Sequence, residues 1–398
     1  MNVQEVRAWI EATVPRAWIE AGRRGGAVAV REVRTRAEYE AWYPVFAASG
    51  LVVPTWPVAY GGLDLSPADA RRVEAELRPF NLGRLNPLGL NNTAPALFAY
   101  GTEEQRLRYL PPIVRNEEKW CQLFSEPGAG SDLASLACRA ERDGDTWRVS
   151  GQKVWTTWAH FSDFAVLLAR TDPDVPKRQG LTYFLVDLHQ PGVDVRPLRH
   201  IGGEVDFNEV FLEGVLVPDD MRVGAVGGGW RVAGATLSGE RQMVSGAGSG
   251  GVDRIGGRGV DHLLTVARQR GALVDPVMRQ ELMRVYSEEA IRNWTNQRVR
   301  ASAQAGRAPG PESSVGKVHQ GTLNQQIQLA ATASLGAGAM AWEGETPYEV
   351  RGMLRSRANT IEGGTTEVNK NIVGERVLGL PREPDPWQGA PWRDVPRS

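Results

Sequence analysis

The sequence has few of the features that would assign it to a specialised class of protein. It holds two cysteines, Cys121 and Cys138, in 398 residues, which excludes a disulfide framework and a cysteine-based metal site. The formal net charge is -1, so charge favours neither a nucleic-acid partner nor a membrane surface. No apolar run approaches the length of a membrane span, and residues 1–7 do not lead into the apolar segment of a signal peptide. We therefore expect a cytoplasmic protein.

Common signals of catalysis or nucleotide binding are also weak. The five histidines fall at no metal-ligand spacing and suggest no Ser-His-Asp arrangement. Residues 246–251 match the dinucleotide fingerprint G-x-G-x-x-G, but they follow a helical-looking segment instead of a strand. Residues 310–317 approximate a phosphate loop, but the spacing is too long and Val318 stands where a hydroxyl is needed. We interpret the first as helix packing or a loop and the second as coincidence.

The sequence does have a pair of distinctive blocks near its middle. Residues 120–132 (WCQLFSEPGAGSD) pass from an apolar run into a loop of small residues, and residues 151–159 (GQKVWTTWA) follow about twenty residues later. Pro127 restricts the backbone, and Gly128 and Gly130 let it approach a flat or anionic group. Hydroxyls and indoles that would suit a flavin come from Ser125, Ser131, Thr157, Trp155 and Trp158. The residues alone are equally compatible with a hairpin loop and core tryptophans.

Local patterns predict helices at both ends of the chain and strands between them. Ser66 followed by Pro67 predicts a helix start, and Thr102 with Gln105 forms a capping box for a helix that should stop at the Pro111-Pro112 pair. From residue 119 the pattern changes to short β-rich runs separated by turns, which predicts a small barrel or sandwich.

Helical patterns return after residue 225. A long helix should start at Pro276, and a further helix should run from about residue 313 to about residue 340. The apolar face expected for the first of these contains Met278, Leu282, Val285, Ile291 and Trp294. The last residues, 381–398, are rich in proline and tryptophan and should form an extended tail.

The two middle blocks resemble the T/S-E-P-x-A-G-S-D and G-x-K-x-W-x-T signatures of the acyl-CoA dehydrogenase family. Residues 56–62 (WPVAYGG) resemble its W-P-x-x-Y-G-G element, and the resemblance extends over most of the chain. It implies an α+β multi-domain fold: an N-terminal all-α domain (1–118), a central β-barrel or sandwich (119–225) and a C-terminal four-helix bundle with the tail (226–398). It also implies FAD as the cofactor, an acyl-CoA substrate and an electron-transfer flavoprotein or equivalent acceptor.

The resemblance also implies roles for individual residues. The proton α to the thioester carbonyl would be removed by a carboxylate. Aligned on the family's Tyr-Glu-Gly-Thr motif, the usual base position is Gly363, and Glu362 is one residue early. A minority of the family, resembling the isovaleryl and long-chain enzymes, takes the base from an earlier helix immediately before an arginine. This matches Glu240 and Arg241, so we favour Glu240 and keep Glu362 as the alternative.

The remaining implied roles concern the flavin and CoA. The backbone N–H of Gly363 would help to bind the thioester oxygen. Arg241 would hold the adenine end of CoA, with Ser131 and Gly364 also on the substrate side. The implied cofactor-binding residues are Gln122, Phe124, Ser125, Gly130, Ser131, Trp155, Thr157, Thr365, Thr366 and Glu367.

Two departures from the family pattern fall on its inter-subunit cofactor clamp. The R-x-x-F-G motif is replaced at residues 268–271 (RQRG), and Q-x-x-G-G-x-G is replaced at residues 328–338 (QLAATASLGAG). The sequence therefore leaves a homotetramer and a heteromeric assembly with a second acyl-CoA dehydrogenase-like chain both open. It resembles actinobacterial chains that pair with a different subunit and act on bulky acyl groups.

These observations predict FAD-dependent α,β-dehydrogenation of an acyl-CoA thioester to the trans-2-enoyl-CoA, with an acyl group that is branched or bulky. A flavin oxidase or monooxygenase on the same fold is one alternative, against which the Glu240-Arg241 pair counts. A non-catalytic partner subunit of a heteromeric enzyme is the other, and the altered clamp favours it.

Overall fold

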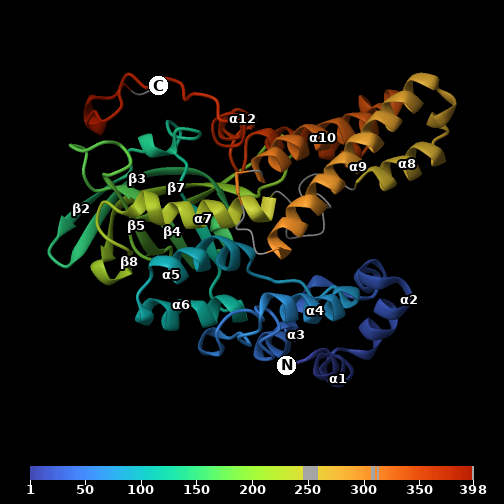
Figure 1. Ribbon diagram of the computed structural model, residues 1–398, viewed down its shortest axis with the longest axis horizontal. Helices are drawn as coiled ribbons and strands as arrows, with labels where there is room; N and C mark the ends of the chain where they lie inside the picture. The colour runs from blue at the N-terminus through green and yellow to red at the C-terminus, as the bar shows by residue number, and fades with distance from the viewer. Residues whose placement is uncertain (245–258, 306–309, 312, 397–398) are drawn as a thin grey trace.

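The computed structural model describes residues 1–244, 259–305, 310–311 and 313–396. Figure 1 shows the sheet at the left, the N-terminal helices in blue below, and the C-terminal helices in orange extending to the right. In that part of the chain no helix is both long and apolar enough to cross a membrane. The α+β arrangement predicted from the sequence is confirmed.

The N-terminal helices surround an aromatic core. Rings of Trp18, Tyr39, Trp42, Tyr43 and Phe46 contact one another with centroids 5.4–6.1 Å apart. Their helices are α1 (Val3–Thr13), α2 (Arg16–Val33), α3 (Arg36–Ala48), α4 (Pro67–Leu77), α5 (Ala94–Tyr100) and α6 (Glu103–Arg115), with a short π-helix at Gly89–Thr93 before α5.

The predicted helix starts are confirmed, but one predicted end is wrong. Ser66 accepts a hydrogen bond from Asp69 N at the start of α4, and Thr102 and Gln105 form the capping box of α6. The α6 helix continues through the two prolines to Arg115. Ile113 and Val114, which lie beyond the prolines, are fully buried, so tertiary burial outweighs the hydrogen bonds that the prolines remove.

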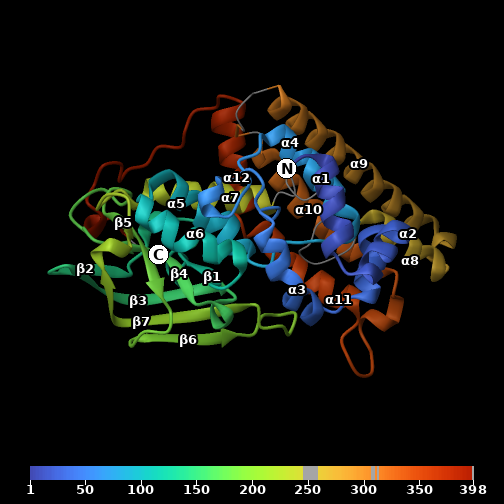
Figure 2. The same cartoon turned by 90° about the horizontal axis from the view of Figure 1, so that it is seen from below.

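The sheet is folded around its own core. Its order is β6-β7-β3-β2-β4-β5-β8, with β1 parallel beside β4, and β2 meets β4 at a single residue pair. Rings of Trp147 on β3 and Phe184 on β5 meet across the core, 5.5 Å apart, so the two halves pack face to face as in a sandwich. Figure 2 shows β3, β7 and β6 side by side. The strands are β1 (Trp120–Leu123), β2 (Arg139–Asp143), β3 (Thr146–Thr157), β4 (Phe164–Arg170), β5 (Leu181–Asp187), β6 (Val193–Leu198), β7 (Phe207–Pro218) and β8 (Arg222–Val223).

The second group of helices begins with α7, which packs between α5 and the strands β4 and β5 (Figure 1). The α8, α9 and α10 helices pack on one another, and α11 and α12 pack on α10. Their bounds are α7 (Gly229–Val244), α8 (Val260–Gln269), α9 (Pro276–Gln304), α10 (Ser313–Ala333), α11 (Tyr348–Arg355) and α12 (Thr366–Ile372).

The apolar face expected for α9 is wrong in its second half. Leu282 and Val285 are buried, but Ile291 is 45% and Trp294 is 62% exposed. The buried face continues through Arg292 and Asn296 instead. The face of α10 that packs against α9 is also polar, so the hydrophobic pattern of the sequence does not reveal the contact between these two helices. Its buried polar residues are Ser314, Lys317, Gln320, Asn324 and Gln328.

Candidate active site

A buried ion pair joins the two distinctive blocks of the sequence. The Lys153 side chain is fully buried on β3, and its Nζ donates to Glu126 Oε1 at 2.8 Å, Phe124 O at 3.0 Å and Leu168 O at 2.9 Å. These three acceptors satisfy all three ammonium donors. The Val154 N–H also donates to Ser125 O at 2.9 Å. The first block is therefore held against the middle of β3.

Glu126 also closes the loop that follows it. Its carboxylate accepts hydrogen bonds from the backbone N–H groups of Ala137 at 2.7 Å and Cys138 at 2.9 Å. Residues 127–136 thus form a compact loop whose two ends meet at one buried carboxylate, as in an Ω-loop. We call these residues the Ω-loop; they include Gly130 and Ser131, which are exposed. The sequence motifs contained Lys153 and Glu126, but their pairing could not be read from them.

An electrostatic contact holds the Ω-loop from outside. Lys177 Nζ lies 2.8 Å from Asp132 Oδ2, and Ser135 Oγ donates to the same carboxylate oxygen at 2.5 Å. Burial acts to raise the pKa of Asp132, but the hydrogen bonds from Lys177 and Ser135 and the Lys177 charge bring it below its ordinary value. The Asp132 carboxylate is consequently ionised at neutral pH.

A β-bulge turns Trp155 away from the core. On β3, Lys153 pairs with Val210 of β7 and Thr156 pairs with Asn208, so two residues of β3 oppose one residue of β7. Trp155 takes the left-handed conformation with φ 60° and its side chain is 55% exposed. A bulky residue with positive φ is strained, and such strain is concentrated at functional sites. The bulge therefore allows Lys153 to point inward and Trp155 to point outward on the same strand.

The other flavin-block residues occupy different environments. Ser125 and Thr157 are half-buried. The Phe124 ring is buried against Tyr183, 6.0 Å between centroids, so its side chain belongs to the core instead of lining an open surface. Gln122 on β1 accepts a hydrogen bond from Asn92 Nδ2 at 2.9 Å, which connects β1 to the π-helix.

The candidate base Glu240 lies on α7, whose backbone is placed by close packing. An ideal Cβ at Gly239 would lie 1.9 Å from the Asn91 carbonyl oxygen of the π-helix, so only glycine permits this approach. Glu240 and Arg241 follow directly in α7, between the N-terminal helices and the sheet. The side chains of Glu240 and Arg241 lie outside the described residues, as does the G-x-G-x-x-G match at 246–251.

The alternative base Glu362 has both carboxylate oxygens engaged. Arg355 Nη2 donates to Oε2 at 3.2 Å and Asn359 Nδ2 donates to Oε1 at 3.2 Å. Asn359 is in turn held by α10: Lys317 Nζ donates to its carbonyl at 2.5 Å, and Asn324 Nδ2 donates to its side-chain oxygen at 2.6 Å. Glu362 is therefore the end of a polar network that fixes the segment leading to Gly363.

Gly363 and Gly364 form a left-handed turn with φ 63° and 89° before α12. This conformation suits glycine, which adopts a positive φ without a clash of a Cβ atom. Thr365 is the N-cap of α12 and accepts a hydrogen bond from Val368 N at 3.1 Å, while Thr366 begins the helix. Glu367, in the first turn, is exposed.

Arg355 also connects this turn to the sheet. Its guanidinium carbon lies 5.7 Å from the Phe207 ring centroid, and the Phe207 ring meets the Trp155 ring edge-on at 5.7 Å. The segment before Gly363 and the bulged Trp155 are thus linked through two side chains.

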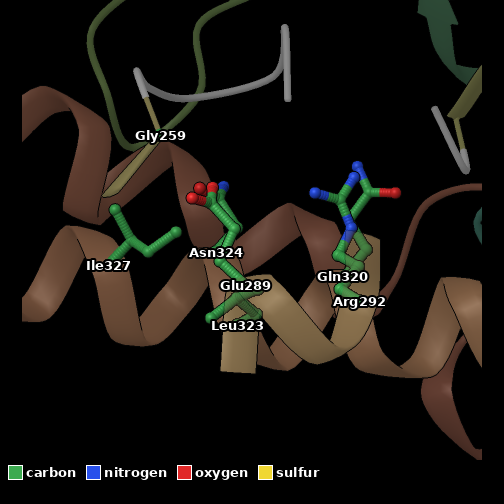
Figure 3. A pocket seen from close by; sticks show the side chains of 7 residues that line it. All are labelled: Gly259, Glu289, Arg292, Gln320, Leu323, Asn324 and Ile327. Carbon is green, nitrogen blue, oxygen red and sulfur yellow. The ribbon is translucent and has the colours of Figure 1, made fainter. Parts of the chain in front are cut away.

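A small pocket between α9 and α10, shown in Figure 3, contains none of the residues expected to bind flavin or CoA. Its lining residues are Gly259, Glu289, Arg292, Gln320, Leu323, Asn324 and Ile327. Asn324 donates to Asn359 and accepts from Gln328, so the polar groups of this pocket take part in packing α10. Lys317, in the phosphate-loop-like segment, is likewise buried against Asn359.

The thiols and acidic groups do not form another reactive centre. Burial raises the pKa of Cys121 to about 12 and that of Cys138 to about 11, so both thiols remain protonated. No group of three or more His, Cys, Asp or Glu residues in the described ranges could hold a metal ion.

The residues near the joined blocks fit a flavin in their chemistry. Thr156 Oγ1 on β3, Thr93 Oγ1 and Asn92 Oδ1 on the π-helix are buried and lack a hydrogen-bond partner within the part of the chain that is described. Buried polar atoms are normally satisfied, so such groups are available for a ligand. A flavin has a planar apolar body with donors and acceptors on its edge, which matches these atoms together with Gln122 and the Trp155 face.

Three family models match the chain in succession. They are the acyl-CoA dehydrogenase N-terminal domain (residues 3–117), middle domain (121–215) and C-terminal domain (227–378). The chain is 39% identical over 399 residues to acyl-CoA dehydrogenase IpdE1 of Mycobacterium tuberculosis, covering 96% of this chain and 99% of the relative. It is 40% identical over 357 residues to acyl-CoA dehydrogenase FadE34 of the same organism, covering 89% of this chain and 48% of that longer protein.

Solved structures agree with these relatives. The Tcur3481-Tcur3483 steroid ACAD superposes with a TM-score of 0.74 at 27% identity, covering 96% of this chain and 97% of that chain. The ChsE4-ChsE5 complex from Mycobacterium tuberculosis superposes with a TM-score of 0.72 at 26% identity and the same coverage. The chain therefore belongs to the acyl-CoA dehydrogenase family of FAD-dependent oxidoreductases.

Proposed function

We propose that this chain catalyses the FAD-dependent conversion of an acyl-CoA thioester to its trans-2-enoyl-CoA. The observation that carries the proposal is the junction of the two blocks, in which Lys153 and Glu126 hold the Ω-loop beside the bulged Trp155. FAD, when bound, supplies the acceptor for the hydride that leaves the β-carbon. The residues proposed to hold it are those of the two blocks, with Thr365, Thr366 and Glu367 at the start of α12.

Glu240 is the proposed base that removes the proton from the α-carbon. The network around Glu362 supports this assignment, because Arg355 and Asn359 engage both of its carboxylate oxygens. The backbone N–H of Gly363 is proposed to bind the thioester oxygen, where it would stabilise the negative charge that develops on proton removal. Arg241 is proposed to bind the adenine end of CoA.

The acyl group is proposed to be branched or bulky. A glycine at position 363 leaves space where most of the family has a glutamate side chain. One similar solved structure is described as a steroid ACAD, which supports a large acyl group here as well.

The working form is proposed to be a heteromeric assembly with a second acyl-CoA dehydrogenase-like chain. Gln328, at the place of the family's inter-subunit clamp, is buried and donates to Asn324 Oδ1 at 3.3 Å instead of extending outward. The outer face of α9 exposes Met283, Tyr286 and Trp294, an apolar stripe typical of an interface. Two similar structures carry paired names, Tcur3481-Tcur3483 and ChsE4-ChsE5.

A visible absorption spectrum of the chain purified alone is the first test. A flavin spectrum that is bleached anaerobically by CoA thioesters with bulky acyl groups is the expected result if the chain completes its own site. A colourless chain that acquires flavin only with a second subunit would support the heteromeric form. A flavoprotein that no CoA thioester reduces, alone or with a partner, would contradict the proposed reaction.

Two matched variants test the base. Glu240→Gln should retain flavin and lose bleaching by substrate, because the amide cannot accept the α-proton. Glu362→Gln should retain most of the reduction rate. The opposite pattern would assign the base to Glu362.

A further inference from the structure

The extended tail of the chain returns to the sheet and contacts the Ω-loop. After α12 the chain runs across to the sheet, as Figure 1 shows in red. It is anchored there by backbone hydrogen bonds from Trp392 N to Val175 O at 2.9 Å and from Arg393 N to Pro173 O at 3.1 Å. Arg393 also forms an ion pair with Asp174. These contacts fix the tail on the segment between β4 and β5.

The side chain of Trp392 reaches from this anchor to the Ω-loop. Its Nε1 donates to the Ser135 carbonyl at 3.1 Å. Its ring covers Arg170, whose guanidinium carbon lies 4.3 Å from the ring centroid. Arg170, itself 3% exposed, donates to Ala134 O at 2.6 Å and Leu136 O at 3.1 Å. Three successive carbonyls of the Ω-loop, at 134, 135 and 136, are therefore held by Trp392 or by the arginine beneath it.

These contacts complete the support of the Ω-loop. Glu126 holds its two ends, and Lys177 holds Asp132 on its outer side. The Lys177 contact is partly exposed and is worth little alone. The Trp392 contact excludes water from a buried guanidinium, so it supplies the stronger hold on the residues that follow Ser131.

We propose that Trp392 is a positioning residue, and that the tail is a strap that holds the Ω-loop in the conformation that binds the CoA thioester through Ser131. The proposal rests on the proposed function, because it takes Ser131 as a substrate contact. It goes further in assigning a role to the last residues of the chain.

Substitution of Trp392 by alanine, followed by hydrogen exchange and steady-state kinetics on the full chain with its flavin and any required partner, tests the strap. One hydrogen bond and one cation–π contact together predict that amides of residues 130–138 exchange about tenfold faster. KM for the thioester should rise by a similar factor while kcat changes little, because the chemistry does not involve Trp392. Trp392→Phe retains an aromatic ring but lacks the N–H donor. Its exchange rates and its KM should fall between those of the unsubstituted chain and those of Trp392→Ala.

Trp387→Ala is the matched control. This tryptophan belongs to the same tail and is 45% exposed, so its removal should alter neither exchange nor KM. A chain that ends at Leu380 should show the same faster exchange and the same rise in KM as Trp392→Ala. This shortened chain tests the strap if the alanine variant folds poorly.

Two results would overturn the strap. Unchanged exchange in residues 130–138 would mean that Trp392 does not hold the Ω-loop. Faster exchange with an unchanged KM would mean that the held conformation has no part in binding. If no thioester is a substrate, the proposed function fails separately. The Kd for FAD then replaces KM as the second readout, because Ser131 is also one of the implied cofactor-binding residues. A rise in this Kd on loss of Trp392 supports the strap, and an unchanged Kd overturns it.

Discussion

Replacing Lys153 by methionine should strongly destabilise the region that joins the two distinctive blocks. The ammonium is fully buried and all three of its donors are used, on Glu126, Phe124 and Leu168. Methionine has a similar length but no charge, so the Glu126 carboxylate, also buried, would lose its counter-ion. Breaking a buried pair in this way costs about 3–5 kcal/mol, a large part of the net stability of an ordinary domain.

Native-state hydrogen exchange measures this effect at the site itself. The Val154 amide, bonded to Ser125 O, should lose protection by about 10²–10⁴-fold, since each 1.4 kcal/mol is a factor of about ten. Flavin retention should fall in parallel, because the same contacts hold the Ω-loop. Lys177→Met is the control: its ion pair with Asp132 is partly exposed, and its loss should cost at most about 1 kcal/mol.

A double-mutant cycle separates the ion pair from other effects of the substitution. Glu126→Gln alone leaves the Lys153 charge buried without a counter-ion, whereas the double variant leaves neither charge. The double variant should therefore be no less stable than Lys153→Met, so its loss of stability should be smaller than the sum of the two single losses. The difference, which is the coupling free energy of the pair, should be about 2 kcal/mol or more. Additive losses, or a Val154 amide whose protection changes less than about threefold in Lys153→Met, would refute the reasoning.

Two further substitutions test other parts of the fold. Hydrogen bonds from Arg222 hold the pKa of Asp219 well below its usual range. This carboxylate therefore contributes its full stabilisation above the unfolded pKa of about 4 and loses it progressively as pH falls from there towards the lowered folded pKa. Asp219→Asn should cost about 1–2 kcal/mol at pH 7 in urea unfolding, and a deficit that does not shrink between pH 7 and pH 2 would contradict this origin. Gly239→Ala places a Cβ 1.9 Å from Asn91 O and should lower the stability of the protein by about 1–3 kcal/mol in thermal unfolding. At Gly234, in the same helix, an added Cβ meets open space, so Gly234→Ala should leave the stability unchanged or raise it. Equal effects of the two substitutions would show that α7 does not pack as described.

Local signals in the sequence predicted local structure well. The caps at Ser66 and Thr102 depend on side chains within three residues of the backbone groups that they bind, and both are confirmed. The failures occur where distant residues decide. The α6 helix passes through Pro111 because the residues beyond it are buried, and Trp294 is exposed because the inward face of α9 becomes polar.

The sequence by itself determined the family, the order of helical and β regions and the two blocks, because these depend on motifs whose residues lie close together in the chain. Only the tertiary structure decided how the blocks are joined. The Lys153–Glu126 pair spans 27 residues and the Trp392–Ser135 bond spans 257, and neither separation has a periodicity that a sequence pattern could reveal. The bulge that turns Trp155 outward depends likewise on its pairing with β7. Such contacts depend on which groups the fold brings together, because a buried donor or acceptor forms its hydrogen bond with a polar group that packs beside it in the folded chain.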